Sequence, residues 1–109
     1  AVPSLKGSLG DLDLAVRLNA AISLSWFSDP AGAAVLRDGT RREIYEAERA
    51  RNPRNYARAE IVRENRVRAL EGLARLARAE DRALLEELAE GDEDLEVREA
   101  AMRALQSEK

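Results

Sequence analysis

The chain has 109 residues, which is the size of one domain with a single core. It contains neither Cys nor His, which excludes thiolate nucleophiles, disulfides, imidazole bases and the usual zinc or haem ligands. The net charge is -3 but uneven: residues 37–68 hold ten Arg against six acids, and residues 71–109 hold six bases against twelve acids.

The residue types are typical of a helical protein. Ala, Leu, Glu and Arg dominate, and aromatic residues make up only 4% of the chain. No apolar run of about twenty residues is present, so we expect a soluble protein without a membrane-spanning helix. Cysteine usage does not indicate the redox compartment, and a cytoplasmic location is therefore the default expectation.

The first predicted unit is helix, tight acidic turn, helix. Val2, Leu5 and Leu9 recur at helical spacing before Gly10, which ends the first helix. Asp13 stands in a good N-cap position, because its carboxylate can accept from the free amides of a first turn. The second helix is apolar nearly all round, which predicts burial on several sides.

The middle of the chain predicts three helices. Asp29-Pro30 begins a short helix over residues 31–36. Thr40-x-x-Glu43 is a capping box that starts an extra helix. Asn52-Pro53 then restarts the chain in a long helix from residue 54 to about residue 79, and a last helix pair follows, with Gly91 between its helices.

Two segments of the chain repeat each other. GDLDLAVRLNAAISL at residues 10–24 returns as GDEDLEVREAAMRAL at residues 91–105, 81 positions later. The identical pairs are Gly10/Gly91, Asp11/Asp92, Asp13/Asp94, Leu14/Leu95, Val16/Val97, Arg17/Arg98, Ala20/Ala101 and Leu24/Leu105. A third, weaker copy begins at Val62-Arg63, although Arg66 stands where the other copies have Ala20 and Ala101. An internal repeat of this length indicates a repeat architecture.

The shared motif D-x-D-x-x-V-R-x-x-A-x-x-x-L resembles the HEAT repeat, in particular the PBS-lyase-type or HEAT-like variety. The resemblance implies an all-α, right-handed superhelix of three helical hairpins, with an irregular helical bundle as the alternative fold. The single domain 1–109 would comprise repeat one (1–28), repeat two (29–79, with an insertion at about 38–52) and a C-terminal capping repeat (80–109). The resemblance also implies a ladder between repeats, formed by Asp11, Asp92, Arg17, Arg63 and Arg98.

The outer faces of the two clear copies differ. Ala15, Leu18 and Ile22 of the first are replaced by Glu96, Glu99 and Arg103 in the last, as expected where a solenoid ends in water. No such change appears in the first copy. We therefore expect its N-terminal face to be covered by further repeats, by self-association or by a partner.

Candidate partner-binding residues gather around the insertion. Arg51, Arg54 and Arg58 recur at a spacing that places them along one helix face, and Tyr45 and Tyr56 lie among them. Such a face suits phosphates and bases, but glutamates at helical spacing favour a salt-bridged surface. Trp26-Phe27 is typical of packing between repeats, with an exposed interface anchor as the alternative.

The acidic turns admit a capping and ladder role or a calcium site, and Val97 at the position where an EF-hand loop has Gly favours the first. We expect no catalytic, cofactor or metal residues. The expected function is a non-enzymatic scaffold or adaptor that binds protein. The alternatives are an Arg-mediated nucleic-acid binder and, third, a bilin-lyase-like enzyme or its subunit.

Overall fold

The computed structural model describes residues 2–107 and consists of helices joined by short turns. The helices are α1 (Val2–Ser8), α2 (Leu14–Trp26), η1 (Pro30–Gly32), α3 (Ala33–Gly39), α4 (Arg42–Arg51), α5 (Ala59–Leu76), η2 (Ala79–Asp81), α6 (Arg82–Gly91) and α7 (Leu95–Ser107). No strand occurs within the described residues, so the all-α prediction is confirmed. The outermost ends of the predicted repeats one and three, residue 1 and residues 108–109, lie outside the described part.

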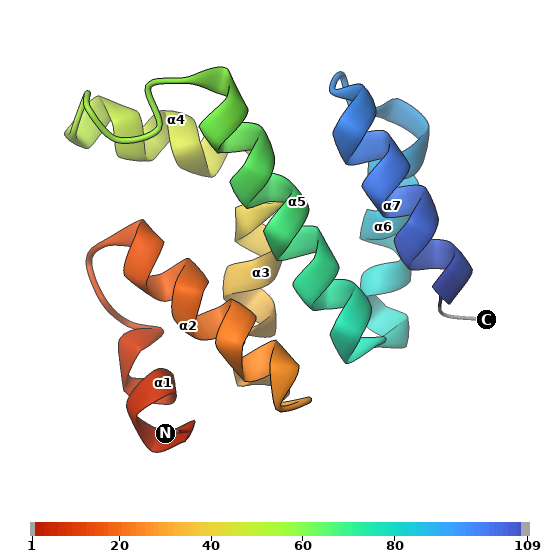
Figure 1. Ribbon diagram of the computed structural model, residues 1–109, viewed down its shortest axis with the longest axis horizontal. Coiled ribbons are helices and arrows are strands. Elements are labelled where there is room, and N and C mark those ends of the chain that lie inside the picture. Colours follow the sequence, from red (N-terminus) through yellow and green to blue (C-terminus); the bar gives the residue numbers. More distant parts are fainter. Residues whose placement is uncertain (1, 108–109) are drawn as a thin grey trace.

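The helices form two layers (Figure 1). α2, α5 and α7 run side by side in the front layer, and α5 contacts both of its neighbours. α1 packs on α2, α3 packs behind α5 and α2, and α6 packs behind α7. Each front helix thus has an earlier helix of the chain against it, and α4 is the extra element between α3 and α5.

Three apolar clusters fill the space between these helices. One joins α5 to α6 and α7, one joins α2 to α3 and α5, and one lies where α4 and the turn after it close over α2. Leu36 of α3 and Leu73 of α5 are both completely buried in the second cluster. The close approach of Gly32 to α2 belongs to the same region, since a Cβ there would lie 2.7 Å from the Cα of Ala21.

The helix starts of the two copies agree with the sequence. Asp13 caps α2 by accepting from the Ala15 amide at 2.8 Å, and Asp94 accepts from the Glu96 amide at 2.9 Å before α7. Both helices begin one residue after the aspartate. A carboxylate that satisfies a free amide of the first turn explains why the same residue stands at both positions.

The predicted capping box at Thr40 is wrong. The Thr40 hydroxyl is buried and donates to the carbonyl of Arg37, so it closes the end of α3. Arg41 occupies the N-cap position of α4 and makes no side-chain cap. A hydroxyl can satisfy a carbonyl behind it as well as an amide ahead of it, and the sequence pattern does not distinguish the two.

The predicted start of the long helix at residue 54 is also wrong, because α5 begins at Ala59. Residues 53–56 form a turn in which Tyr56 adopts φ 57°, in the left-handed region. This conformation ends any helix, and it accompanies burial of the Tyr56 ring against Tyr45. Packing of one aromatic side chain has therefore overridden the local helix signal.

No helix within residues 2–107 is both long and apolar enough to cross a membrane.

Candidate partner-binding surface

The acidic turns before α2 and α7 adopt the same hydrogen-bonded conformation. The amide of Asp13 donates to the carboxylate of Asp11 at 2.8 Å, and the amide of Asp94 donates to the carboxylate of Asp92 at 2.9 Å. The first aspartate of each turn therefore fixes the backbone, and the second caps the helix. The aspartates repeated in the sequence thus make the same side-chain hydrogen bonds in both turns.

Two of the predicted ladder bases bind inside their own turns. Arg17 donates to the carbonyl of Asp11 at 2.7 Å, and Arg98 donates to the carbonyl of Asp92 at 2.7 Å. Each guanidinium thus reaches back six residues to a carbonyl of the turn before its helix. These arginines brace a hairpin rather than join one hairpin to the next.

The side chains that do cross between hairpins come from α5. Arg63 donates through Nε to Asp94 at 2.6 Å, and Arg66 binds the two carboxylate oxygens of Asp92 at 2.5 and 3.1 Å. Arg66 also donates to the carbonyl of Thr40 at 2.9 Å, and its side chain is only 5% exposed. Arg66 was not among the expected ladder residues, although it makes the most buried ion pair with the α6–α7 turn.

These contacts lower the pKa values of both aspartates, Asp92 and Asp94. Burial would raise the pKa of Asp92, but hydrogen bonds from Arg66 and from the Asp94 amide, together with the charges of Arg66 and Arg42, outweigh burial and hold that pKa below its ordinary value. Asp94 follows the same pattern, because Arg63 and the following amides outweigh its partial burial and lower its pKa. The hydrogen bond to Asp94 raises the pKa of Arg63 in turn.

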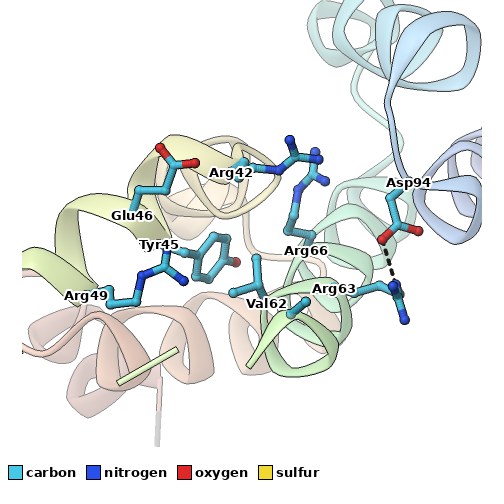
Figure 2. Close-up of a pocket in the computed structure, with 9 residues that line it drawn as sticks. Arg42, Tyr45, Glu46, Arg49, Val62, Arg63, Arg66 and Asp94 are labelled. Carbon is cyan, nitrogen blue, oxygen red and sulfur yellow. Dashed lines mark hydrogen bonds and ion pairs between the residues drawn. The ribbon is translucent and has the colours of Figure 1, made fainter. Parts of the chain in front are cut away.

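An arginine-lined pocket of about 220 Å³ lies between α4 and α5 beside this turn (Figure 2). Its lining residues are Arg42, Tyr45, Glu46, Arg49, Ala59, Val62, Arg63, Arg66 and Asp94. Arg42 pairs with Glu93 at 2.8 Å, and Arg49 donates to the carbonyl of Tyr56 at 3.2 Å. The other two arginines are those that bind the α6–α7 turn. All four guanidinium groups are therefore engaged by the chain itself.

The residues expected around the insertion do not gather on one surface. Tyr45 and Tyr56 are buried with their ring centroids 5.0 Å apart, and the Tyr45 hydroxyl donates to a backbone carbonyl at 2.5 Å. Arg51 ends α4, Arg54 lies in the turn and Arg58 is the N-cap of α5, so the predicted common helix face is wrong. The break of the helix before Ala59 is the physical reason.

Large apolar side chains are exposed instead on the first hairpin. In the turn before α2, Leu12 is 80% exposed; on and after α2, Val16, Trp26 and Phe27 are 36%, 69% and 59% exposed. We call these four residues, with Asp11 and Asp13 on either side of Leu12, the N-terminal surface; Leu12 precedes α2, and Trp26 and Phe27 lie at its other end. Trp26 packs on Arg75 of α5 through one ring face and is otherwise exposed, so both interpretations apply to it in part, whereas the exposure of Phe27 matches the alternative of an exposed anchor.

Trp26 is exposed, but another side chain covers one face of its ring. The guanidinium of Arg75, from α5, lies 3.8 Å from the centroid of its ring, and Arg75 also donates to the hydroxyl of Ser25 at 3.0 Å. Burial lowers the pKa of Arg75. The stacked cation holds the indole in one orientation while leaving its other face to solvent.

At the other end of the molecule, α7 presents a polar face to solvent. Leu18 and Ile22 are buried in α2, whereas Glu99 and Arg103, which occupy their positions in α7, are exposed. The replacements predicted for a C-terminal cap therefore lie in water. Leu95 and Met102 are the large apolar side chains exposed on α7.

The chain matches no family model, no curated protein and no solved structure. Residues 2–107 contain no group of three or more acidic side chains placed to hold a metal ion.

Proposed function

We propose that this chain is a non-enzymatic HEAT-like repeat module, a scaffold or adaptor that binds another protein through the N-terminal surface. The observation that carries the proposal is the exposure of Leu12, Val16, Trp26 and Phe27 on one hairpin. Aromatic and aliphatic side chains of this size are typical anchors of protein interfaces. Self-association through the same surface is the second way to cover it.

The repeat identity rests on the row of hairpins and on the two matching turns. In a right-handed superhelix of three hairpins, α1/α2, α3/α5 and α6/α7 would be the repeats and α4 the insertion in the second. α5 lies between α2 and α7, as the second helices of successive repeats do. The domain would then be one solenoid over residues 1–109, in which Asp11, Asp92, Arg17 and Arg98 brace the turns and Arg63 joins the second repeat to the third.

Four arginines that are paired within the chain favour protein over nucleic acid as the partner. Arg42, Arg63 and Arg66 are held in ion pairs with acids of the α6–α7 turn, and Arg51 lies 3.5 Å from Glu48. Cations that are neutralised within the chain release few counterions from a phosphate backbone. An apolar surface with single charges at its edge suits a protein interface better.

Affinity capture with matched variants tests the function. The wild-type chain and the variant Leu12→Ser/Phe27→Ser are immobilised and exposed to a native lysate with and without nuclease treatment, and their bound proteins are identified. The control is Leu95→Ser/Met102→Ser, which removes two exposed apolar side chains from the other end of the molecule. We expect specific proteins to be lost with the first variant and retained with the control.

Two outcomes would contradict this proposal. Capture that disappears from the wild type after nuclease treatment indicates nucleic acid as the partner. Capture that is equal for wild type and Leu12→Ser/Phe27→Ser removes the N-terminal surface from the interface. Sedimentation of the wild type over a range of concentrations separates self-association from binding of another protein.

A further inference from the structure

The last hairpin is held on α5 by two kinds of contact. The first is the pair of charged contacts from Arg63 and Arg66 to the aspartates of the α6–α7 turn. The second is the apolar cluster that includes Leu70 of α5 and, from α7, Val97, Ala100 and Ala104. Charge at the turn and small apolar side chains along the helix therefore act together in this interface.

The first hairpin carries both features at equivalent positions. Asp11 and Asp13 stand 81 residues before Asp92 and Asp94 and make the same turn hydrogen bonds. The equivalents of the three α7 residues are Val16, Asn19 and Ser23. Asn and Ser are small enough to let another helix approach α2 closely, as the alanines do in α7.

On this side of α2, Asp13 and Asn19 line an open pocket together with Arg54 and Tyr56 of the turn after α4 and with Asn65 and Arg68 of α5. Within the described residues, no arginine forms an ion pair with the carboxylates of Asp11 or Asp13, which accept hydrogen bonds from the amides of Asp13 and Ala15; Arg17 binds only the backbone carbonyl of Asp11 in this pair. Both acids and Asn19 are exposed, and Val16 is 36% exposed. The acids are thus arranged as in the occupied turn, and the adjoining helix face is open beside them.

We propose that the N-terminal surface binds an α-helix of a partner protein that carries two arginines three residues apart, with small or apolar side chains on the same face. The arginines would bind Asp11 and Asp13, and the apolar side chains would pack along Val16 and Phe27. The internal contact of α5 with the last hairpin is the template for this docking. The proposal rests on the proposed function and specifies the chemistry of its partner.

A second copy of the chain does not supply such a helix without breaking its own structure. Among the helices of residues 2–107, α5 is the one with arginines three residues apart, Arg63 and Arg66. Both are bound to Asp94 and Asp92 of the same molecule. A second copy that keeps its own contacts therefore does not supply the complementary helix.

A synthetic peptide with the sequence of residues 59–76, acetylated and amidated, is the probe. It is titrated into the isotope-labelled chain while amide chemical shifts are followed, and the fluorescence of Trp26, the single tryptophan, gives a second readout. We expect saturable binding with shifts at residues 11–16 and at Phe27. The peptide with Arg63→Gln/Arg66→Gln should bind about tenfold more weakly.

Matched variants of the chain locate the charges. Asp11→Asn/Asp13→Asn keeps an acceptor oxygen at both positions, so the turn and the cap persist while the charges are lost. We expect it to weaken peptide binding about tenfold. The control is Glu87→Gln/Glu90→Gln, which removes two exposed charges from α6 and should leave peptide affinity unchanged.

Three results would overturn the inference. They are absence of saturable binding, equal affinity for the asparagine variant and the wild type, and shifts centred on Asp92 and Asp94, which would mean that the peptide displaces α5. Capture of cellular proteins that depends on Leu12 and Phe27, without peptide binding, would leave the proposed function standing and refute this inference alone.

Discussion

Removal of the Asp92 carboxylate probes the contact that ties the last hairpin to α5. Asp92→Ala leaves the guanidinium of Arg66, whose side chain is 5% exposed, without two charge-assisted hydrogen bonds. It also removes the acceptor of the Asp94 amide. Breaking one partner of a buried pair costs about 3–5 kcal/mol. Because Arg66 keeps its bond to the Thr40 carbonyl, we expect a loss of about 3 kcal/mol.

Urea unfolding followed by far-ultraviolet circular dichroism measures this loss. With a slope of about 1.5 kcal/mol/M for a domain of this size, the unfolding midpoint should fall by about 2 M. The control is Glu93→Ala, in the same turn. The Glu93 side chain is 81% exposed in its pair with Arg42, and such a pair contributes less than about 1 kcal/mol.

A double variant separates the buried charge from the lost contacts. Arg66→Met combined with Asp92→Asn removes both charges and keeps an acceptor for the Asp94 amide, so it should be clearly more stable than Asp92→Ala. The reasoning is refuted if Asp92→Ala is no less stable than Glu93→Ala, or if the double variant recovers nothing.

Three further measurements address the acid turn and the core. The pKa of Asp92 is lowered in the folded chain, so the unfolded chain takes up the proton first as the pH falls. The stabilisation from Asp92 should therefore be fully present above about pH 5 and decline below about pH 4. Urea titrations across that range should show a smaller decline for Asp92→Asn. Gly32→Ala would place a Cβ 2.7 Å from the backbone of α2 and should destabilise the fold by about 2 kcal/mol. Gly7→Ala, with nothing within 4 Å of the new Cβ, should stabilise α1 by up to about 1 kcal/mol. Thermal unfolding that ranks the two variants the other way would contradict this packing. Leu36→Ala, at a side chain with 0% exposure, should cost about 3 kcal/mol, and Leu12→Ala, at one 80% exposed, less than about 0.5 kcal/mol; equal losses in chemical unfolding would be inconsistent with the second apolar cluster.

The sequence predicted the parts of the fold that depend on neighbours along the chain. Asp13 and Asp94 cap the helices that follow them, and Gly91 ends α6 as its position suggested. The turn before α5 was not predictable in this way. Its left-handed Tyr56 accompanies a ring contact with Tyr45, eleven residues earlier, and no local propensity encodes that contact.

The candidate site was predicted in part. The repeat identified both acidic turns, but Arg66 looked like a mismatch because the other copies have Ala20 and Ala101 there. Its partner Asp92 lies 26 residues further on, a separation that helical periodicity does not reveal. The one available signal was the spacing of Arg63 and Arg66, three residues apart on one helix face and opposite two aspartates separated by one residue.

The position of α5 between α2 and α7 determines which part of the molecule unfolds last. Each outer hairpin is anchored to the same central helix, so thermal fraying at one end need not disturb the other. Backbone amides near Leu70 and Leu73 should exchange with solvent last, since their release requires both ends to detach. Proteolysis or hydrogen exchange at either end would therefore depend on detachment of that end alone, whereas global unfolding requires both hairpins to leave α5.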